Sequence, residues 1–327
     1  MNTLDKFQGS LVGLALGDAL GAPMEFTFGI PDPPVTDMQI NTMLLPFLGE
    51  KTPRGYWTDD TSMALCSAYS LIKKGRFDRK DQMMNFLKWY REGFFSSTGS
   101  CFDIGNTIRS SLIEFEATKE VNQLADPYDN NLGNGSLMRL SPIPLFFYKQ
   151  PKSAIKISGS SSLMTHKAGL CAEVCRCMAA FIVACFSSTH MDDLMCTVGD
   201  YSSFYYPSVF RDLLTWLKDP YDVVVTKPKV WLSGTGHVLL SFHAAIWAFF
   251  TTDNFRDGCI KAVNLGGDTD TYGAIYGQLA GVYYGFDHIK EYAGDWLHDL
   301  VDLEMIKSIA EQLYSASTAR SIDDENL

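Results

Sequence analysis

Two stretches of the chain, WTDDTS at 57–62 and VNLGGDTDTYG at 263–273, concentrate Thr and Asp just before segments with helical periodicity. The six oxygen-bearing side chains are Thr58, Asp59, Asp60, Asp268, Asp270 and Thr271. Thr and Asp are favoured helix N-caps, and carboxylates in a first turn complement the helix dipole. One side chain fills an N-cap position, however, so capping alone leaves most of these oxygens without a role.

If the two stretches meet in space, their four carboxylates would repel one another in a partly buried site, and a divalent cation would relieve that repulsion. All six donors are hard oxygens with no His or Cys beside them, which favours magnesium, manganese or calcium over zinc. Six donors suffice for two ions about 3.5–4 Å apart, an arrangement that orients water and substrate oxygens together. The pattern therefore predicts a binuclear site, with the capping of two separate helices as the alternative.

Six motifs follow one another along the chain: GDALGAPMEF at 17–26, WTDDTSMAL at 57–65, FDIGNTIRSSL at 102–112, GNGSLMRLSPIPL at 133–145, TH at 165–166 and VNLGGDTDTYGAIYG at 263–277. This ordered set resembles the ADP-ribosylglycohydrolase family, of the dinitrogenase reductase-activating type, over roughly residues 6–285. The resemblance implies an all-α fold with two Mg²⁺ or Mn²⁺ ions at the base of an ADP-ribose cleft. It also implies that the six oxygen donors are the metal ligands.

The resemblance further implies a set of catalytic carboxyl groups. Glu25 matches an acidic residue placed against the ribose, with a solvated loop carboxylate as the alternative. Asp103, in FDIG, matches a loop of the arginine-directed branch, and a carboxylate fits a guanidinium bidentately. A plain cap for the helix that begins near Gly105 is the alternative. Together with Asp60 and Asp268, Glu25 and Asp103 are the predicted catalytic residues.

The GNGS loop suits an anion, because glycines let backbone N–H groups approach a diphosphate without an intervening Cβ. An ordinary turn is the alternative. Arg139 would add a charge there or pair with a buried acid, and His166 would line the cleft or serve as a cap or core residue. His237 stands where relatives carry a Tyr, so it would stack on adenine with a smaller ring or lose that contact. The predicted substrate-binding residues are Glu25, Asp103, Gly133, Asn134, Gly135, Ser136, Met138, His166 and His237.

Helical periodicity dominates the rest of the chain. The segments that show it are 6–21, 60–74, 80–93, 104–116, 166–187, 237–251, 256–264, 271–285 and 295–314. Strand-like alternation is scarce, and YDVVVTKP at 221–228 is the best candidate. We expect one compact all-α domain of orthogonal helices over residues 1–317, with the metal site in a central cleft, followed by a flexible tail at 318–327.

Two helical segments carry glycine at every fourth position, GSLVGLALGDALG at 9–21 and GAIYGQLAGVYYG at 273–285. Each interior glycine costs about 1 kcal/mol relative to Ala, so eight of them need a compensating gain. A four-residue repeat lines one helix face and lets another backbone approach closely. The stripes therefore predict close packing of these two helices at the centre of the domain. Asp18, beside the first stripe, is expected to have a packing role or to lie behind the metal ligands.

Composition limits the other possibilities. The chain has 327 residues, 46% of them hydrophobic, and its net charge of −11 argues against binding to a nucleic-acid backbone. Its apolar runs are shorter than the ~20 residues that span a bilayer, and its N-terminus lacks a signal pattern, so a cytoplasmic location without membrane partners is expected. The cysteines of CAEVCRC at 171–177 are expected to be buried thiols, with a zinc site as the alternative.

The expected activity is hydrolysis of an N-glycosidic bond that joins ADP-ribose to a protein side chain, with arginine as the preferred side chain. The partners are then an ADP-ribosylated protein and ADP-ribose itself. One alternative within the family is hydrolysis of serine-linked ADP-ribose or of O-acetyl-ADP-ribose. Another is an inactive protein that binds ADP-ribose or an ADP-ribosylating toxin, although a scaffold has little reason to keep all six metal donors.

Overall fold

A computed structural model describes residues 2–25, 31–39, 41–44, 51–121, 124–126, 128–204, 209 and 236–319. The α-helices are α1 Thr3–Gly21, α2 Asp59–Lys74, α3 Arg79–Glu92, α4 Asn106–Thr118, α5 Pro142–Phe146, α6 Pro151–Ser162, α7 Gly169–Ala184, α8 Met191–Asp200, α12 Val238–Phe250, α13 Phe255–Val263, α14 Thr269–Tyr284, α15 Phe286–Asp299 and α16 Leu303–Ala319. Short 3₁₀ turns, η1 Ala22–Met24 and η2 Tyr201–Phe204, follow α1 and α8. Two short antiparallel strands, β1 Asn41–Leu44 and β2 Lys51–Thr52, complete these ranges. Within these ranges the fold is therefore all-α apart from one small hairpin, which the sequence pattern did not predict.

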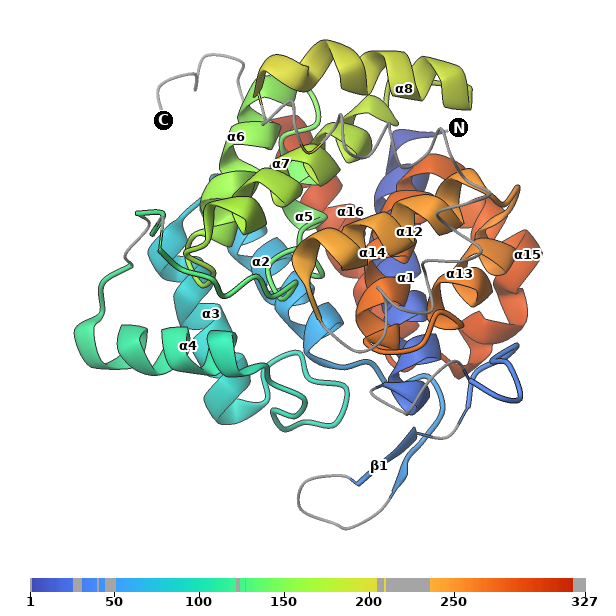
Figure 1. Ribbon diagram of the computed structural model, residues 1–327, viewed down its shortest axis with the longest axis horizontal. Helices are drawn as coiled ribbons and strands as arrows, with labels where there is room; N and C mark the ends of the chain where they lie inside the picture. The colour runs from blue at the N-terminus through green and yellow to red at the C-terminus, as the bar shows by residue number, and fades with distance from the viewer. Residues whose placement is uncertain are drawn as a thin grey trace.

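Helices α1 and α14 lie side by side at the centre of the molecule (Figure 1). Their glycine stripes face each other: a Cβ added to Gly13 would lie 2.5 Å from the carbonyl oxygen of Gly277, and the flanking glycine pairs are closer still. Ser10 Oγ donates a hydrogen bond across the seam to the Gln278 carbonyl oxygen at 2.8 Å. The predicted close packing of the two striped helices is thus confirmed.

This antiparallel seam brings the end of α1 to the start of α14. Thr269 Oγ1 donates to the Gly21 carbonyl oxygen at 2.8 Å. One turn earlier in α1, the buried Asp18 carboxylate accepts hydrogen bonds from the Thr58 N–H at 2.9 Å and from the Thr61 N–H at 3.0 Å. Asp18 therefore fastens the first turn of α2 to α1, which is the supporting role expected of it.

The predicted helix at 295–314 is wrong as a single element, because α15 and α16 are separated by a turn at 300–302. Val301 N–H donates to the Gly55 carbonyl oxygen at 3.1 Å, and Asp302 has a positive φ of 48°. A hydrogen bond to a residue almost 250 positions earlier in the chain thus interrupts the helix, although the local periodicity predicts one continuous helix.

Helices α5, α6 and α8 were not predicted. Their sequences are short, proline-containing or rich in Ser, and so carry weak helical signals. The strand candidate at 221–228 lies outside the described residues, as do residues 320–327 of the expected tail. Thr318 and Ala319, the first two residues of that tail, belong to α16.

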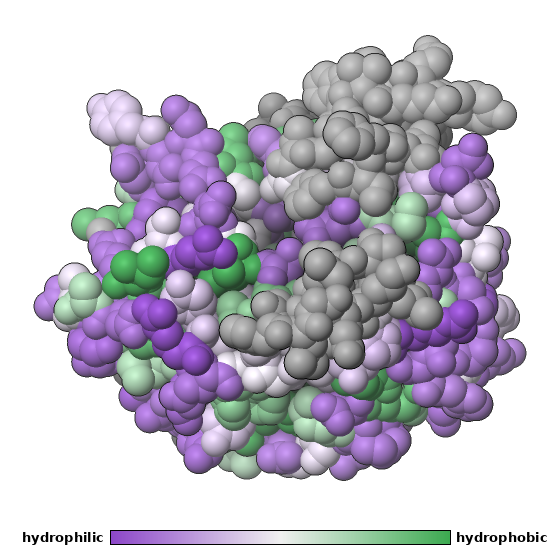
Figure 2. Space-filling view, turned by 90° about the horizontal axis from the view of Figure 1, so that it is seen from below, coloured by the Kyte–Doolittle hydropathy of each residue, from purple (hydrophilic) through white to green (hydrophobic). Residues whose placement is uncertain are grey.

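Cys171, Cys175 and Cys177 are buried free thiols on α7, as predicted. Hydrophilic residues predominate on the face shown in Figure 2, where hydrophobic residues form small separate groups. No helix within the described ranges has both the length and the apolar character needed to cross a membrane.

Candidate functional site

A cavity of about 350 Å³ is lined by the first turns of α2, α4 and α14, by Glu25 from the segment that follows α1, and by the loop at 133–135. The two oxygen-rich stretches meet at its base, since Thr58 Oγ1 lies 3.4 Å from Asp270 Oδ2. The predicted site residues that line the cavity are Glu25, Asp59, Asp60, Asp103, Gly133, Asn134, Gly135, Met138, His166, Asp268, Asp270 and Thr271. The predicted convergence of two stretches some two hundred residues apart is confirmed.

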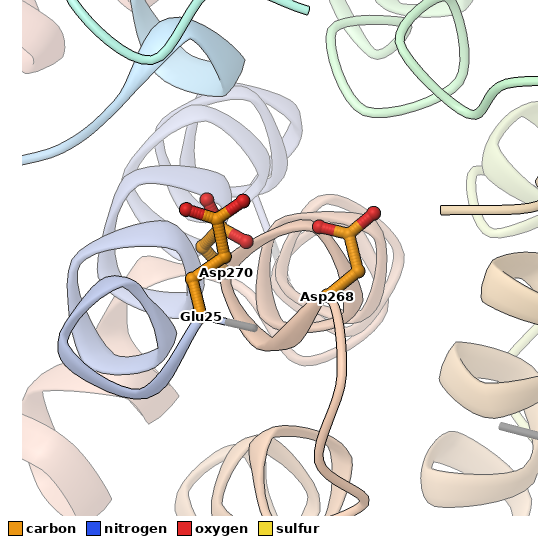
Figure 3. Close-up of side chains that lie close together, drawn as sticks. All are labelled: Glu25, Asp268 and Asp270. Carbon is orange, nitrogen blue, oxygen red and sulfur yellow. The ribbon is translucent and has the colours of Figure 1, made fainter. Parts of the chain in front are cut away.

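Three carboxyl groups among the described residues form a close cluster. Glu25, Asp268 and Asp270 each offer one oxygen, and these oxygens lie within 4.8 Å of one another. Figure 3 shows the three side chains gathered at the N-terminal end of α14, with Glu25 reaching them from the residues that follow α1. Glu25 therefore sits among the candidate metal donors, whereas the family resemblance implies a catalytic residue placed against the ribose.

Burial makes this cluster electrostatically costly. Desolvation, followed by repulsion from neighbouring carboxylates, raises the pKa values of Asp59, Asp60 and Asp270 well above the usual range. Desolvation and then Asp103 raise the pKa of Glu25 to about 11. Among the described residues Asp60 Oδ2 is buried without a hydrogen-bond partner. Hard oxygens that are crowded, buried and partly unpaired fit a divalent cation.

Capping explains little of this arrangement. Thr58 is the N-cap of α2 and accepts from the Asp60 N–H at 3.4 Å. Asp268 occupies the N-cap position of α14 but makes no capping hydrogen bond with its side chain. The capping alternative therefore accounts for Thr58 and leaves the carboxylates of both helices to another role.

Asp268 is held from outside the two stretches. Asn134 Nδ2 donates to Asp268 Oδ2 at 2.7 Å and to Ser241 Oγ at 2.9 Å. The Asn134 side chain thus orients a carboxylate at the cavity base. Ser241 is a supporting residue that sequence reasoning missed, because it lies on the apolar helix α12 and belongs to no motif.

Asp103 also lines the cavity, and it is not a helix cap. The N-cap of α4 is Gly105, which makes no side-chain capping bond, so the capping alternative is wrong. Asp103 has a positive φ of 59°, a conformation that Asp tolerates better than most residues. Its side chain shares a hydrogen bond with Glu25, while burial raises the pKa of Asp103.

The GNGS loop is divided between the cavity and the core. Gly133, Asn134 and Gly135 line the cavity, whereas Ser136 Oγ lies in the core, 2.8 Å from Ser162 Oγ. The loop pattern predicts Ser136 among the substrate-binding residues, but its side chain lies in the core, because the chain turns inward after Gly135.

Two further expectations around this loop need correction. Arg139 forms no ion pair with an acid in the described part of the chain and is not among the residues that line the cavity: its guanidinium donates to the Gly135 carbonyl oxygen at 2.7 Å and to Thr165 Oγ1 at 2.8 Å. The His237 ring accepts from the Leu239 N–H at 3.2 Å and caps α12, so the preceding Gly236 lines the cavity instead.

The raised carboxyl pKa values predict a pH dependence of stability. In the metal-free protein these groups keep protons that the unfolded chain releases, so the free energy of unfolding falls as pH rises. The fall begins near pH ~4, where unfolded carboxyls titrate, and continues through the pKa of Asp18 at about 7 towards that of Glu25 at about 11. Urea unfolding in EDTA should therefore give a lower free energy at about pH 8 than at about pH 5. Added Mg²⁺ should flatten the slope; stability that rises with pH in EDTA would contradict the prediction.

Comparisons with known proteins agree with the ordered motifs. A sequence model described as ADP-ribosylglycohydrolase matches residues 1–322. The chain is 34% identical over 314 residues to the ADP-ribosylarginine hydrolase Tri1 of Serratia proteamaculans, covering 95% of this chain and 80% of that protein. It is 26% identical over 331 residues to the ADP-ribosyl-dinitrogen-reductase glycohydrolase of Rhodospirillum rubrum, covering 98% of each. A solved structure described as an ADP-ribosylglycohydrolase-related protein complex is 34% identical, with a TM-score of 0.75 over 96% of this chain and 99% of that one.

Proposed function

The chain belongs to the ADP-ribosylglycohydrolase family, and from that premise we propose that it is an enzyme that releases ADP-ribose from modified arginine side chains of proteins. The observation that carries the proposal is the buried acidic cluster at the base of the cavity, with Asp103 beside it. The similarity to an arginine hydrolase supports the choice of arginine over serine.

The proposed cofactors are two divalent cations, Mg²⁺ or Mn²⁺. The residues that would hold them are Thr58, Asp59, Asp60, Asp268, Asp270 and Thr271, with Glu25 close enough to take part. When bound, the cations would neutralise the crowded carboxylates, hold substrate oxygens and lower the pKa of a bound water. The buried, hard-oxygen donor set supports this proposal.

Asp103 and Glu25 would manage the leaving group. A carboxylate can receive a guanidinium through two parallel hydrogen bonds, and Asp103 sits on the cavity wall where it could do so. Guanidine leaves a ribose readily only when its departing nitrogen is protonated, and burial raises the pKa values of Glu25 and Asp103, which would favour a shared proton beside the cavity. Two carboxyl groups commonly divide acid and base work at a glycosidic bond in this way.

The diphosphate would lie against Gly133, Gly135 and His166, with Met138 on the same wall. A side chain would be crowded at both glycines: a Cβ on Gly135 would lie 2.8 Å from Ile108 Cδ1, and one on Gly133 would lie 3.3 Å from His166 Nε2. Backbone at these two positions can therefore approach an oxyanion closely, as a phosphate-binding loop requires.

A comparison of two substrates tests the proposal. The protein should release ADP-ribose from an arginine-ADP-ribosylated protein much faster than from a serine-ADP-ribosylated one, because a carboxylate at Asp103 pairs with guanidinium and has no such partner on serine. Release can be followed by chromatography of free ADP-ribose. Release from serine alone would defeat the arginine assignment.

Chelation in the same assay separates the metal from the substrate. Exhaustive EDTA treatment should abolish release, and Mg²⁺ or Mn²⁺ added back should restore it; comparing the two ions at equal concentration identifies the better cofactor. Activity that survives chelation would overturn the metal assignment and leave the linkage assignment standing.

A further inference from the structure

Three buried polar side chains, Arg139, Thr165 and His166, are linked by hydrogen bonds behind the GNGS loop. Arg139 Nη1 donates to the Gly135 carbonyl oxygen at 2.7 Å, and Nη2 donates to Thr165 Oγ1 at 2.8 Å. Thr165 Oγ1 in turn lies 2.8 Å from His166 Nδ1. Arg139, Thr165 and His166 are each no more than 2% exposed, so solvent does not compete for these bonds.

The direction of each bond follows from the chemistry of its members. A guanidinium has donors only, so the Thr165 oxygen accepts from Arg139 and its own single proton remains to be placed. Among the described residues His166 Nδ1 is the acceptor available to that proton. The opposite direction, with Nδ1–H donating to Thr165, would bury the hydroxyl proton without a partner, at a cost of about 1–3 kcal/mol. His166 Nδ1 therefore accepts, and the ring proton lies on Nε2.

His166 Nε2 is the atom of these linked side chains that meets the cavity. It lies between the two glycines of the loop, since a Cβ added to Gly133 or to Gly135 would each come within 3.3 Å of it. Burial, with Arg139 as a second cause, lowers the pKa of His166 to about 3. The imidazole is consequently neutral at ordinary pH, and its one N–H faces the cavity.

We propose that Thr165 and Arg139 are positioning residues that hold His166 in its Nε2–H tautomer, so that the cavity wall presents one fixed hydrogen-bond donor to an oxyanion. The inference rests on the proposed function in taking that oxyanion to be a phosphate group of ADP-ribose. Arg139 acts from behind the loop: it tethers the Gly135 carbonyl oxygen and sets the direction of the Thr165 hydroxyl without touching the substrate itself.

The tautomer can be tested without any substrate. In ¹⁵N-histidine-labelled, ligand-free protein, His166 should show a protonated Nε2 and an unprotonated Nδ1, with its signals assigned by their loss in His166→Asn. Thr165→Val keeps the shape of the side chain and removes the hydroxyl, so it should release the ring into a mixture of tautomers. Thr165→Ser should restore the Nε2–H form. A wild-type spectrum with the proton on Nδ1, or an unchanged spectrum in Thr165→Val, would overturn the proposal.

Binding and kinetics supply a second readout. Thr165→Val should weaken ADP-ribose binding about twofold by calorimetry if the two tautomers become equally populated, because affinity falls with the fraction of protein in the competent form, and it should raise KM more than it lowers kcat. Thr165→Ser should recover both. If wild-type protein shows the Nε2–H tautomer yet binds no ADP-ribose, the proposed function fails, but the positioning of His166 by Thr165 and Arg139 stands. If wild type, Thr165→Val and Thr165→Ser all bind ADP-ribose equally, this positioning has no part in recognition and the proposal fails.

Discussion

Asp268→Asn is expected to abolish turnover while leaving the protein folded. The Asp268 carboxylate lies at the cavity base with Glu25 and Asp270, and the substitution removes a negative charge that a bound cation needs. Metal ions supply several kcal/mol of charge stabilisation in such sites, so kcat should fall by on the order of 10³-fold. The fold should survive, because an amide oxygen at this position can still accept the hydrogen bond from Asn134.

The metal-free variant should in fact be at least as stable as the wild type. Burial raises the pKa of Asp268, so its charge opposes folding at neutral pH, and an uncharged isostere removes that cost. Thermal unfolding in EDTA measures stability, and Mn²⁺ titration by calorimetry measures metal affinity. Asp192→Asn, on the exposed face of α8, is the matched control and should change neither. A variant that melts much earlier than wild type, with normal Mn²⁺ affinity, would favour a purely structural role for Asp268.

Gly17→Ala should cost about 3 kcal/mol of stability or more, as overpacking a rigid contact does. The new Cβ would overlap the carbonyl oxygen of Gly273, and backbone cannot move aside as a flexible side chain can. Ala is otherwise the better helix former by about 1 kcal/mol, so a net loss reports the clash directly. Gly294→Ala is the matched control, because Gly294 is also helical and has open space around it.

Urea unfolding of the two variants checks this prediction. Gly294→Ala should be as stable as the wild type or slightly more stable, whereas Gly17→Ala should unfold at a much lower urea concentration or fail to fold. Equal stability of both variants would mean that the glycine stripe is not what sets the distance between α1 and α14.

The sequence predicted the site best where the residue type itself restricts the chemistry. Hard oxygen donors before α2 and α14, and glycines at every fourth position of α1 and α14, each leave few physical explanations, and these predictions agree with the geometry. Side-chain direction on a loop is a different matter. Ser136 lies in the GNGS motif and His237 stands where relatives carry a Tyr, yet the Ser136 side chain turns into the core and His237 caps α12. No local pattern distinguishes these orientations from orientation toward the cavity.

Supporting contacts made across the chain were equally beyond prediction. Ser241 reaches Asp268 only through Asn134, and neither partner is near it in sequence. The break between α15 and α16 depends on Gly55, which contacts that turn but is almost 250 positions away from it in sequence. Such contacts become visible only once the packing of the helices is known.

The packing of the glycine stripes of α1 and α14 also determines the stage of protein synthesis at which the catalytic centre can form. The hydrogen bond from Thr269 to Gly21 closes a loop of 248 positions, so α1 leaves the ribosome long before its partner α14 is synthesised. Contacts so distant in sequence form slowly, and during that interval the bare glycine face of α1 has nothing to pack against. The nascent polypeptide therefore cannot begin to act on a substrate until α14, Thr269–Tyr284, has emerged.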